Sequence, residues 1–150
     1  MQHVVSLQGV ATSICVVLSG AEDRAFVSCN SGNGAITPAA LTEDALQDCT
    51  HLHIGGYFNC AQLQCGELVQ RLQQCKQRGV SISIDTQFDV SDKWGTQDGI
   101  FQQILALADV FLPNELEVQR VVGASSVEDA MQVLTRSHPQ PWLTASLCFL

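Results

Sequence analysis

From residue 51 onward, short apolar runs alternate three times with stretches of helical periodicity, and this alternation restricts the fold more than any other feature. The runs typical of strands cover residues 51–54, 80–84 and 109–112. The stretches that place apolar side chains on one helix face cover residues 61–77, 98–107 and 114–122. Because this alternation is typical of βαβ units, we predict an α/β fold with parallel strands and right-handed crossovers.

Helix-boundary signals support these ranges. Gly79 and Gly123 follow two of the helices, where glycine commonly ends a helix. The pattern Ser125-x-x-Glu128 predicts a capping box for a helix over 126–136. Upstream, Thr37-Pro38 is a helix-start signal, and a short helix is predicted over 42–48.

Two further apolar runs, residues 12–18 and 24–29, do not fit the alternation. The turn-like segment 20–23 separates them, so they predict a β-hairpin that stands off the main sheet. At the other end, residues 142–150 look like the start of one more strand. Since parallel strands are usually buried on both faces, a sheet of so few strands indicates the middle of a larger α/β domain.

Charge and hydropathy exclude two classes of partner. The net charge is −8 with seven Lys and Arg, and no basic patch is visible, so nucleic acid is not an expected partner. No run of 18 apolar residues occurs, so no segment is expected to span a membrane. The N-terminus has no Lys or Arg before its apolar part, which argues against a secretory signal.

The seven cysteines form no Cys-x-x-Cys pair and are scattered through apolar or helical stretches. We interpret them as reduced thiols of a cytoplasmic protein. His51 and His53 lie two apart on one strand face, which leaves two interpretations: a metal-binding pair, or two polar strand side chains.

Polar residues and glycines follow each parallel strand, where ligands bind in open parallel sheets. The candidates are Gly55-Gly56, then Asp85 with Gln87 and Asp89, then Asn114 with Glu115 and Glu117. Carboxylates there could hold sugar hydroxyls or Mg²⁺ through water. The alternatives are structural: the glycines form a turn, Asp85 caps the next segment, and Asn114 is a helix N-cap whose acidic neighbours favour the dipole.

No GxGxxG, GxxxxGK[ST] or GxSxG pattern supports a dinucleotide site, a P-loop or a nucleophile elbow. The order of the segments is more informative than any single motif. The segments are VATSICVVLSGAEDRAFVSCNSGNGAITPAAL, HLHIGGYF, VSISIDTQFDVSDKW and ADVFLPNELEVQRVVG. Over roughly residues 10–136 they resemble the PfkB family of carbohydrate kinases, with the ribokinase-like fold; the last segment carries the family's Asn-x-x-Glu motif.

The resemblance implies a partial ribokinase-like three-layer αβα sandwich, with one partial kinase domain over 1–150. Its hairpin lid would cover about residues 10–30 and its βα core about 50–150. It implies transfer of the γ-phosphate of ATP to a hydroxymethyl group of a carbohydrate or related small molecule, with ATP and Mg²⁺ as cofactors. By resemblance, Asn114 and Glu117 bind the cofactor, with Glu117 at the metal.

By the same resemblance, Arg24 of the lid, Gly55 and Asp85 contact the sugar, and a homodimer through the lid is expected. Two family segments have no counterpart here. The opening strand with the Gly-rich sugar-binding segment would precede Met1, and the Gly-x-Gly-Asp motif with the catalytic base and anion hole would follow Leu150. At the second site the family often has an Asp-x-Asn-x-x-Arg-like pattern, and the segment Asp85-Thr86-Gln87-Phe88-Asp89 of this chain departs from it.

Three interpretations of the chain are open, and the first is a member of a kinase family that lacks part of the catalytic machinery. No catalytic residue is assigned, and the chain is expected to be inactive by itself although it belongs to a kinase family. The alternative is a truncated, non-catalytic isoform or an incomplete gene product that acts, if at all, as a binding or interaction fragment. A redox or metal protein that uses the cysteines is the third interpretation.

Overall fold

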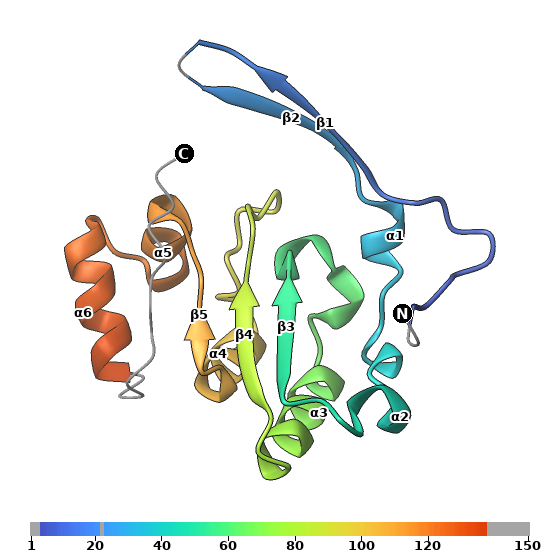
Figure 1. Cartoon of the computed structure of the whole chain (residues 1–150). Coiled ribbons are helices and arrows are strands. Elements are labelled where there is room, and N and C mark those ends of the chain that lie inside the picture. The colour runs from blue at the N-terminus through green and yellow to red at the C-terminus, as the bar shows by residue number, and fades with distance from the viewer. Residues whose placement is uncertain (1–3, 22, 138–150) are drawn as a thin grey trace.

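Three parallel strands form the centre of the computed structural model, which describes residues 4–21 and 23–137 (Figure 1). The strands are β3 (His51–Gly55), β4 (Ser81–Asp85) and β5 (Val110–Phe111), in the order β3-β4-β5. His51 pairs with Ser81, Gly55 with Asp85, and Ile84 with Phe111. The predicted α/β class with a parallel sheet is therefore confirmed.

Helices α3 (Gly66–Gln77) and α4 (Ile100–Leu107) lie behind the sheet in the view of Figure 1, and α5 (Glu115–Val122) and α6 (Val127–Ser137) follow β5. Shorter elements connect the hairpin to the sheet: α1 (Ser31–Gly34), a 3₁₀ turn at Pro38–Ala40 and α2 (Glu43–Leu46). Two more 3₁₀ turns, Tyr57–Asn59 and Ala61–Leu63, lie between β3 and α3.

The core lies between the sheet and the two helices behind it. Ile54, Ile82 and Ile84 face this side and are buried with the apolar faces of α3 and α4. An aromatic cluster extends the core toward the strand ends, with ring centroids 5.1–6.3 Å apart: Tyr57, Phe58, Trp94, Phe101 and Phe111. Since burying one large apolar side chain contributes about 1.5–3 kcal/mol, these residues dominate the stability of the fold.

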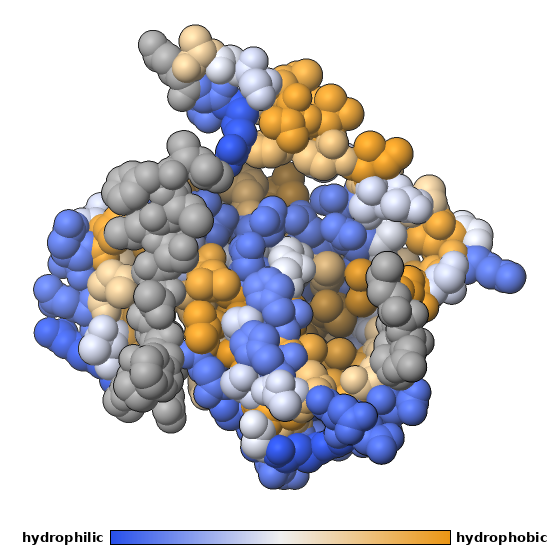
Figure 2. Space-filling model, viewed as in Figure 1, coloured by the Kyte–Doolittle hydropathy of each residue, from blue (hydrophilic) through white to orange (hydrophobic). Residues whose placement is uncertain are grey.

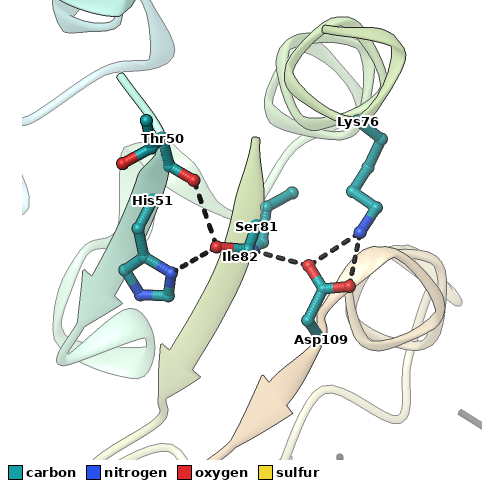
Figure 3. A network of polar contacts seen from close by, with 6 residues as sticks. All are labelled: Thr50, His51, Lys76, Ser81, Ile82 and Asp109. Atoms are coloured by element: carbon teal, nitrogen blue, oxygen red, sulfur yellow. Dashed lines mark hydrogen bonds and ion pairs between the residues drawn. The ribbon is translucent and has the colours of Figure 1, made fainter. Parts of the chain in front are cut away.

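A polar network holds the amino ends of the three strands together (Figure 3). Lys76 of α3 donates to both carboxylate oxygens of Asp109, at 2.5 and 2.7 Å. The Asp109 carboxylate in turn accepts a hydrogen bond of 2.7 Å from the main-chain N–H of Ile82. In a regular sheet, a carbonyl of the neighbouring strand would accept that bond. On the other side of β4, Ser81 donates its main-chain N–H and its hydroxyl to the carbonyl of Thr50. The network therefore joins α3 to every strand of the sheet.

The hairpin consists of β1 (Ile14–Ser19) and β2 (Arg24–Cys29), which are antiparallel. It stands away from the sheet on the side of the carboxyl ends (Figure 1). All of its residues are exposed, and Figure 2 shows apolar surface along it. The predicted hairpin that stands off the sheet is therefore confirmed.

Some predicted boundaries were wrong. The helix expected over 61–77 begins at Gly66, because residues 57–63 form 3₁₀ turns that bury Tyr57, Phe58 and Leu63. The cap of α6 is Ser126, whose hydroxyl accepts the N–H of Asp129, and not Ser125. The helix expected over 42–48 covers only Glu43–Leu46. The strand expected over 142–150 lies outside the described residues.

Candidate functional site

The carboxyl ends of the three strands bring most of the predicted site residues together. Gly55 and Asp85 are register partners on neighbouring strands. Thr86 follows Asp85 directly, and its hydroxyl donates to Glu117 of α5 at 3.5 Å. The strand-end positions of the sequence therefore converge on one edge of the sheet, on the same side as the hairpin (Figure 1).

Asn114 and Glu117 form a reciprocal capping box at the start of α5. The Asn114 side-chain oxygen accepts the N–H of Glu117 at 2.9 Å, and the Glu117 carboxylate accepts the N–H of Asn114 at 3.1 Å. The Asn114 amide also donates to Glu117 Oε1 at 2.8 Å. The structural interpretation of Asn114 as an N-cap is confirmed, and the same contacts hold the carboxylate in one orientation.

The Glu117 side chain is buried, with 5% of its surface exposed. Burial raises the pKa of Glu117, and the nearby Asp85 carboxylate raises it further, while hydrogen bonds from Asn114 and Thr86 oppose the rise. Two carboxylates thus lie close enough for their charges to repel. A divalent cation bound between them would remove this repulsion, so these oxygen donors fit Mg²⁺ held through water.

Asp85 closes a turn on the residue two positions further on. Its Oδ1 accepts the N–H of Gln87 at 3.0 Å, and Gln87 adopts a left-handed conformation with φ of 58°. Gly56 is also left-handed, with φ of 69°, a conformation that glycine adopts without strain. Both structural alternatives, a turn at Gly56 and a cap at Asp85, are therefore observed, and Asp85 is half-buried.

Asp89 does not join the site. It is 5% exposed and accepts hydrogen bonds from the main-chain N–H groups of Ser91, Lys93 and Trp94 and from the Ser91 hydroxyl. Burial would raise the pKa of Asp89, but these four donors outweigh it and lower the pKa. Asp89 thus organises the loop between β4 and α4.

Arg24 lies on the hairpin, with its guanidinium 5.5 Å from the centre of the Phe26 ring. Within the described part of the chain, no hydrogen bond or ion pair joins Arg24 to the strand ends. The structure therefore places Gly55, Asp85, Asn114 and Glu117 together and leaves Arg24 apart on the lid.

Two contributors were missed by sequence reasoning. Thr86 is fully buried and contacts Glu117, and its position directly after Asp85 was the available signal. His53 was considered as one half of a metal pair or as a polar strand side chain, and not as part of the strand-end site, yet its Nε2 would lie 3.3 Å from a side-chain carbon placed on Gly55. Among the described residues, no group of three or more His, Cys, Asp or Glu could hold a metal ion.

The sequence profile of pfkB family carbohydrate kinases matches residues 1–141. The chain belongs to this family. Among solved structures, a ribokinase-like protein of E. coli in complex with ATP and Mg²⁺ is 26% identical, with a TM-score of 0.63. The match covers 88% of this chain and 43% of that one. No curated protein matches the chain.

Two other kinases share the fold. Fructokinase from Vibrio cholerae O395, bound to fructose, ADP and calcium, is 20% identical with a TM-score of 0.68; the match covers 98% of this chain and 48% of that one. Adenosine kinase of Anopheles gambiae, in complex with a diadenosine tetraphosphate, is 17% identical with a TM-score of 0.68, and the match covers 91% and 40%. The chain thus spans less than half the length of these relatives. The predicted pfkB membership and the ribokinase-like fold with its hairpin are confirmed.

No helix in residues 4–21 and 23–137 is both long and apolar enough to cross a membrane.

Proposed function

We propose that the chain is part of an ATP-dependent kinase that transfers the γ-phosphate to a hydroxymethyl group of a carbohydrate or a related small molecule. The observation that carries the proposal is the buried Glu117 carboxylate, fixed by Asn114 and next to Asp85 at the sheet edge below the hairpin. Phosphoryl transfer depends mainly on positioning and on neutralising phosphate charge, and a fixed acidic pair that can hold Mg²⁺ serves both.

The cofactor side of the site is assigned to α5. Glu117 would hold Mg²⁺ through water, and Asn114 would keep the carboxylate oriented toward the metal and the phosphates of ATP. When bound, Mg²⁺ would neutralise charge on the transferring phosphate. The support is geometric: both carboxylate oxygens of Glu117 contact Asn114, so the carboxylate cannot rotate without breaking the helix cap.

The acceptor side is assigned to Gly55, Asp85 and Arg24. Gly55 has no side chain at the strand end, which leaves room for a ligand beside the half-buried Asp85. Arg24 would reach the substrate from the lid. Sugar hydroxyls are donors that a carboxylate can accept, so Asp85 would orient the substrate rather than activate it.

A homodimer through the hairpin is the expected assembly. Val16 pairs with Val27 in the strand register, so their side chains lie on the same face of the hairpin. No side chain on this face is charged; the other members are Ile14, Leu18, Ala25 and Cys29. The opposite side carries Arg24, Phe26 and Ser28. One face of the lid is thus apolar and self-complementary, while the other mixes polar and aromatic side chains.

A cytoplasmic location is proposed on the cysteines. The six cysteines in the described residues are all free thiols, which is typical of a reducing compartment.

The 150 residues contain no Gly-x-Gly-Asp motif, so the catalytic base and anion hole of the family have no counterpart among them. We therefore expect this chain to bind Mg²⁺-ATP without transferring phosphate by itself. Calorimetric titration with ATP, with and without Mg²⁺, tests the binding, and a coupled ADP assay with fructose, ribose and adenosine tests the transfer.

The matched pair Glu117→Gln and Glu115→Gln decides the assignment. Both residues lie in the first turn of α5, but Glu117 is buried at the site and Glu115 is exposed. Glu117→Gln should abolish the Mg²⁺ dependence of ATP binding, whereas Glu115→Gln should preserve it. Equal Mg²⁺ dependence in the two variants would show that the metal is held elsewhere.

A further inference from the structure

Four side chains form a continuous hydrogen-bonded chain on the sheet face opposite α3 and α4. His51 Nδ1 lies 2.7 Å from Ser81 Oγ, and His51 Nε2 lies 2.8 Å from Ser83 Oγ. His53 Nδ1 also lies 2.8 Å from Ser83 Oγ. At the far end, Ser81 Oγ lies 3.1 Å from the carbonyl of Thr50. The chain thus runs along the sheet from Thr50, at its amino end, to His53, two residues before the last residue of β3.

The chain has a direction because each hydroxyl has one proton and each neutral imidazole has one N–H. If Ser81 donates to the Thr50 carbonyl, it must accept from His51 Nδ1. His51 Nε2 is then an acceptor, which takes the proton of Ser83. Ser83 in turn accepts from His53 Nδ1, and His53 Nε2 is left without a proton.

The reverse direction is the one other consistent arrangement with both rings neutral. Ser81 would donate to His51 Nδ1, every later bond would turn round, and His53 Nε2 would carry a proton. The Ser81 oxygen would then face the Thr50 carbonyl oxygen at 3.1 Å with no proton between them. The first direction therefore makes one more hydrogen bond, and a carbonyl can only accept. Ser83 is 5% exposed, so water cannot readily replace a mismatched bond there.

The free nitrogen at the end of the chain lies beside the candidate site. A side-chain carbon placed on Gly55 would lie 3.3 Å from His53 Nε2. His53, Gly55 and Asp85 project to the same face of the sheet, because their positions in the two paired strands share the same parity and register. His53 itself is exposed and Asp85 is half-buried, so both residues can be reached from solvent on this face of the sheet.

We infer that His53 Nε2 accepts a hydrogen bond from a hydroxyl group of the acceptor substrate, a polyol or sugar, at Gly55. Ser83, His51 and Ser81 are positioning residues that fix the tautomer of His53. This inference rests on the proposed function, because it names a contact of the same substrate. It also gives Gly55 a further role, since any side chain there would press against the imidazole nitrogen.

Nitrogen-15 NMR of the histidine rings tests the tautomer, at a pH at which both rings are neutral. The expected result is that His51 and His53 both carry the proton on Nδ1. Protons on Nε2 of both rings would overturn the inference. Ser83→Ala should give a mixture of His53 tautomers. Ser83→Thr should keep the wild-type tautomer, because threonine keeps the hydroxyl. Ser81→Ala should give a mixture of His51 tautomers before it affects His53, because Ser81 contacts His51 directly.

Titration with fructose and ribose tests the contact. The expected result is a shift of the His53 Nε2 resonance by several ppm, together with the Gly55 amide, and loss of that nitrogen shift in Ser83→Ala. A sugar that moves the Gly55 and Gly56 amides but leaves His53 Nε2 unchanged would overturn the inference and leave the proposed function in place. If neither sugar moves any of these signals, while Mg²⁺-ATP binds, the acceptor assignments fail together.

Discussion

Asn114 and Glu117 hold each other through three hydrogen bonds of 2.8–3.1 Å, two donated by their main-chain N–H groups and one by the Asn114 side-chain amide, so one pair of residues starts α5 and orients the acidic group of the site. A helix cap and a metal-binding motif are usually treated as alternatives. Here the same atoms form the cap and fix the carboxylate that we propose as a Mg²⁺ ligand. Substitutions at Asn114 can separate the two roles.

Asn114→Ala should destabilise the protein by about 1 kcal/mol, since the N-cap acceptor is lost. Asn114→Ser should recover most of that stability, because serine caps helices well, but it cannot donate from an amide to Glu117 Oε1. We therefore expect urea unfolding to report near wild-type stability for Asn114→Ser, and calorimetry to report weak Mg²⁺-ATP binding. Recovery of both properties in the serine variant would mean that Asn114 acts only as a cap.

Asp109 predicts how stability depends on pH. Burial raises the pKa of Asp109, but the hydrogen bonds from Lys76 and Ile82 and the charge of Lys76 outweigh burial and lower it. Because the pKa is lower in the folded protein, the stabilisation is complete above the unfolded value of about 4 and is lost as the pH falls further.

Asp109→Asn should therefore cost about 1.5–3 kcal/mol near neutral pH, the usual range for hydrogen bonds to charged groups. The difference from the wild type should shrink below about pH 4, where Asp109 of the unfolded chain takes up a proton before Asp109 of the folded protein does. Urea unfolding of the wild type and of Asp109→Asn over this pH range measures the difference in unfolding free energy. A difference that stays constant with pH would show that the charge of Asp109 does not contribute.

Gly95 and Gly99 form a matched pair in the loop before α4. Both are left-handed, with φ of 69° and 72°, so alanine at either position costs about 1–2 kcal/mol of backbone strain. At Gly95 the new carbon would also lie 2.5 Å from Cβ of Phe101 in the aromatic cluster, whereas at Gly99 it would meet nothing within 4 Å.

Gly95→Ala should therefore be less stable than Gly99→Ala by a further 1–3 kcal/mol or so, the usual penalty for overpacking a core. Thermal unfolding, followed by near-ultraviolet circular dichroism, compares the two variants. Equal melting temperatures would indicate that the loop moves away from Phe101 without penalty.

Val16 and Val17 test the lid interface because both are 50% exposed and lie on opposite faces of the hairpin. Val16→Asp would place a charge on the apolar face and should weaken self-association at least about tenfold, since burying an unpaired charge is costly. Val17→Asp, on the face with Arg24, should leave the strength of self-association nearly unchanged. Sedimentation velocity at several concentrations measures both, and a monomeric wild type would contradict the proposed dimer.

The main features of the fold could be predicted because they depend on local pattern. The strands β3 and β4 are apolar runs that end at Gly55 and Asp85, and Gly123 is left-handed at the end of α5, as a C-terminal glycine should be. The start of α3 could not be predicted, because buried 3₁₀ turns place Tyr57, Phe58 and Leu63 at spacings that also suit a helix. Ser125 and Ser126 are both suitable caps, and the choice depends on how α6 packs.

The site was predictable in part for the same reason. Asp85 ends β4, and Asn114 and Glu117 lie at the start of the helix after β5, so the order of neighbouring strands brings them together. Asp89 was misleading, because only the folding of the loop onto Trp94 shows that its carboxylate points inward. The histidine–serine chain depends on the register that sets His53 opposite Ser83, and register between two strands cannot be read from either strand alone.

The capping box has a thermodynamic consequence for cation binding. Any ion that draws the Glu117 carboxylate away from the Asn114 N–H loosens the first turn of α5, so the order of that helix and the occupancy of the site are linked equilibria. Substitutions far from the metal that stiffen or fray α5 should then change apparent cation affinity without touching a ligand. If Glu117 binds a cation as proposed, opening of the capping box would lower the apparent affinity of the site for that cation.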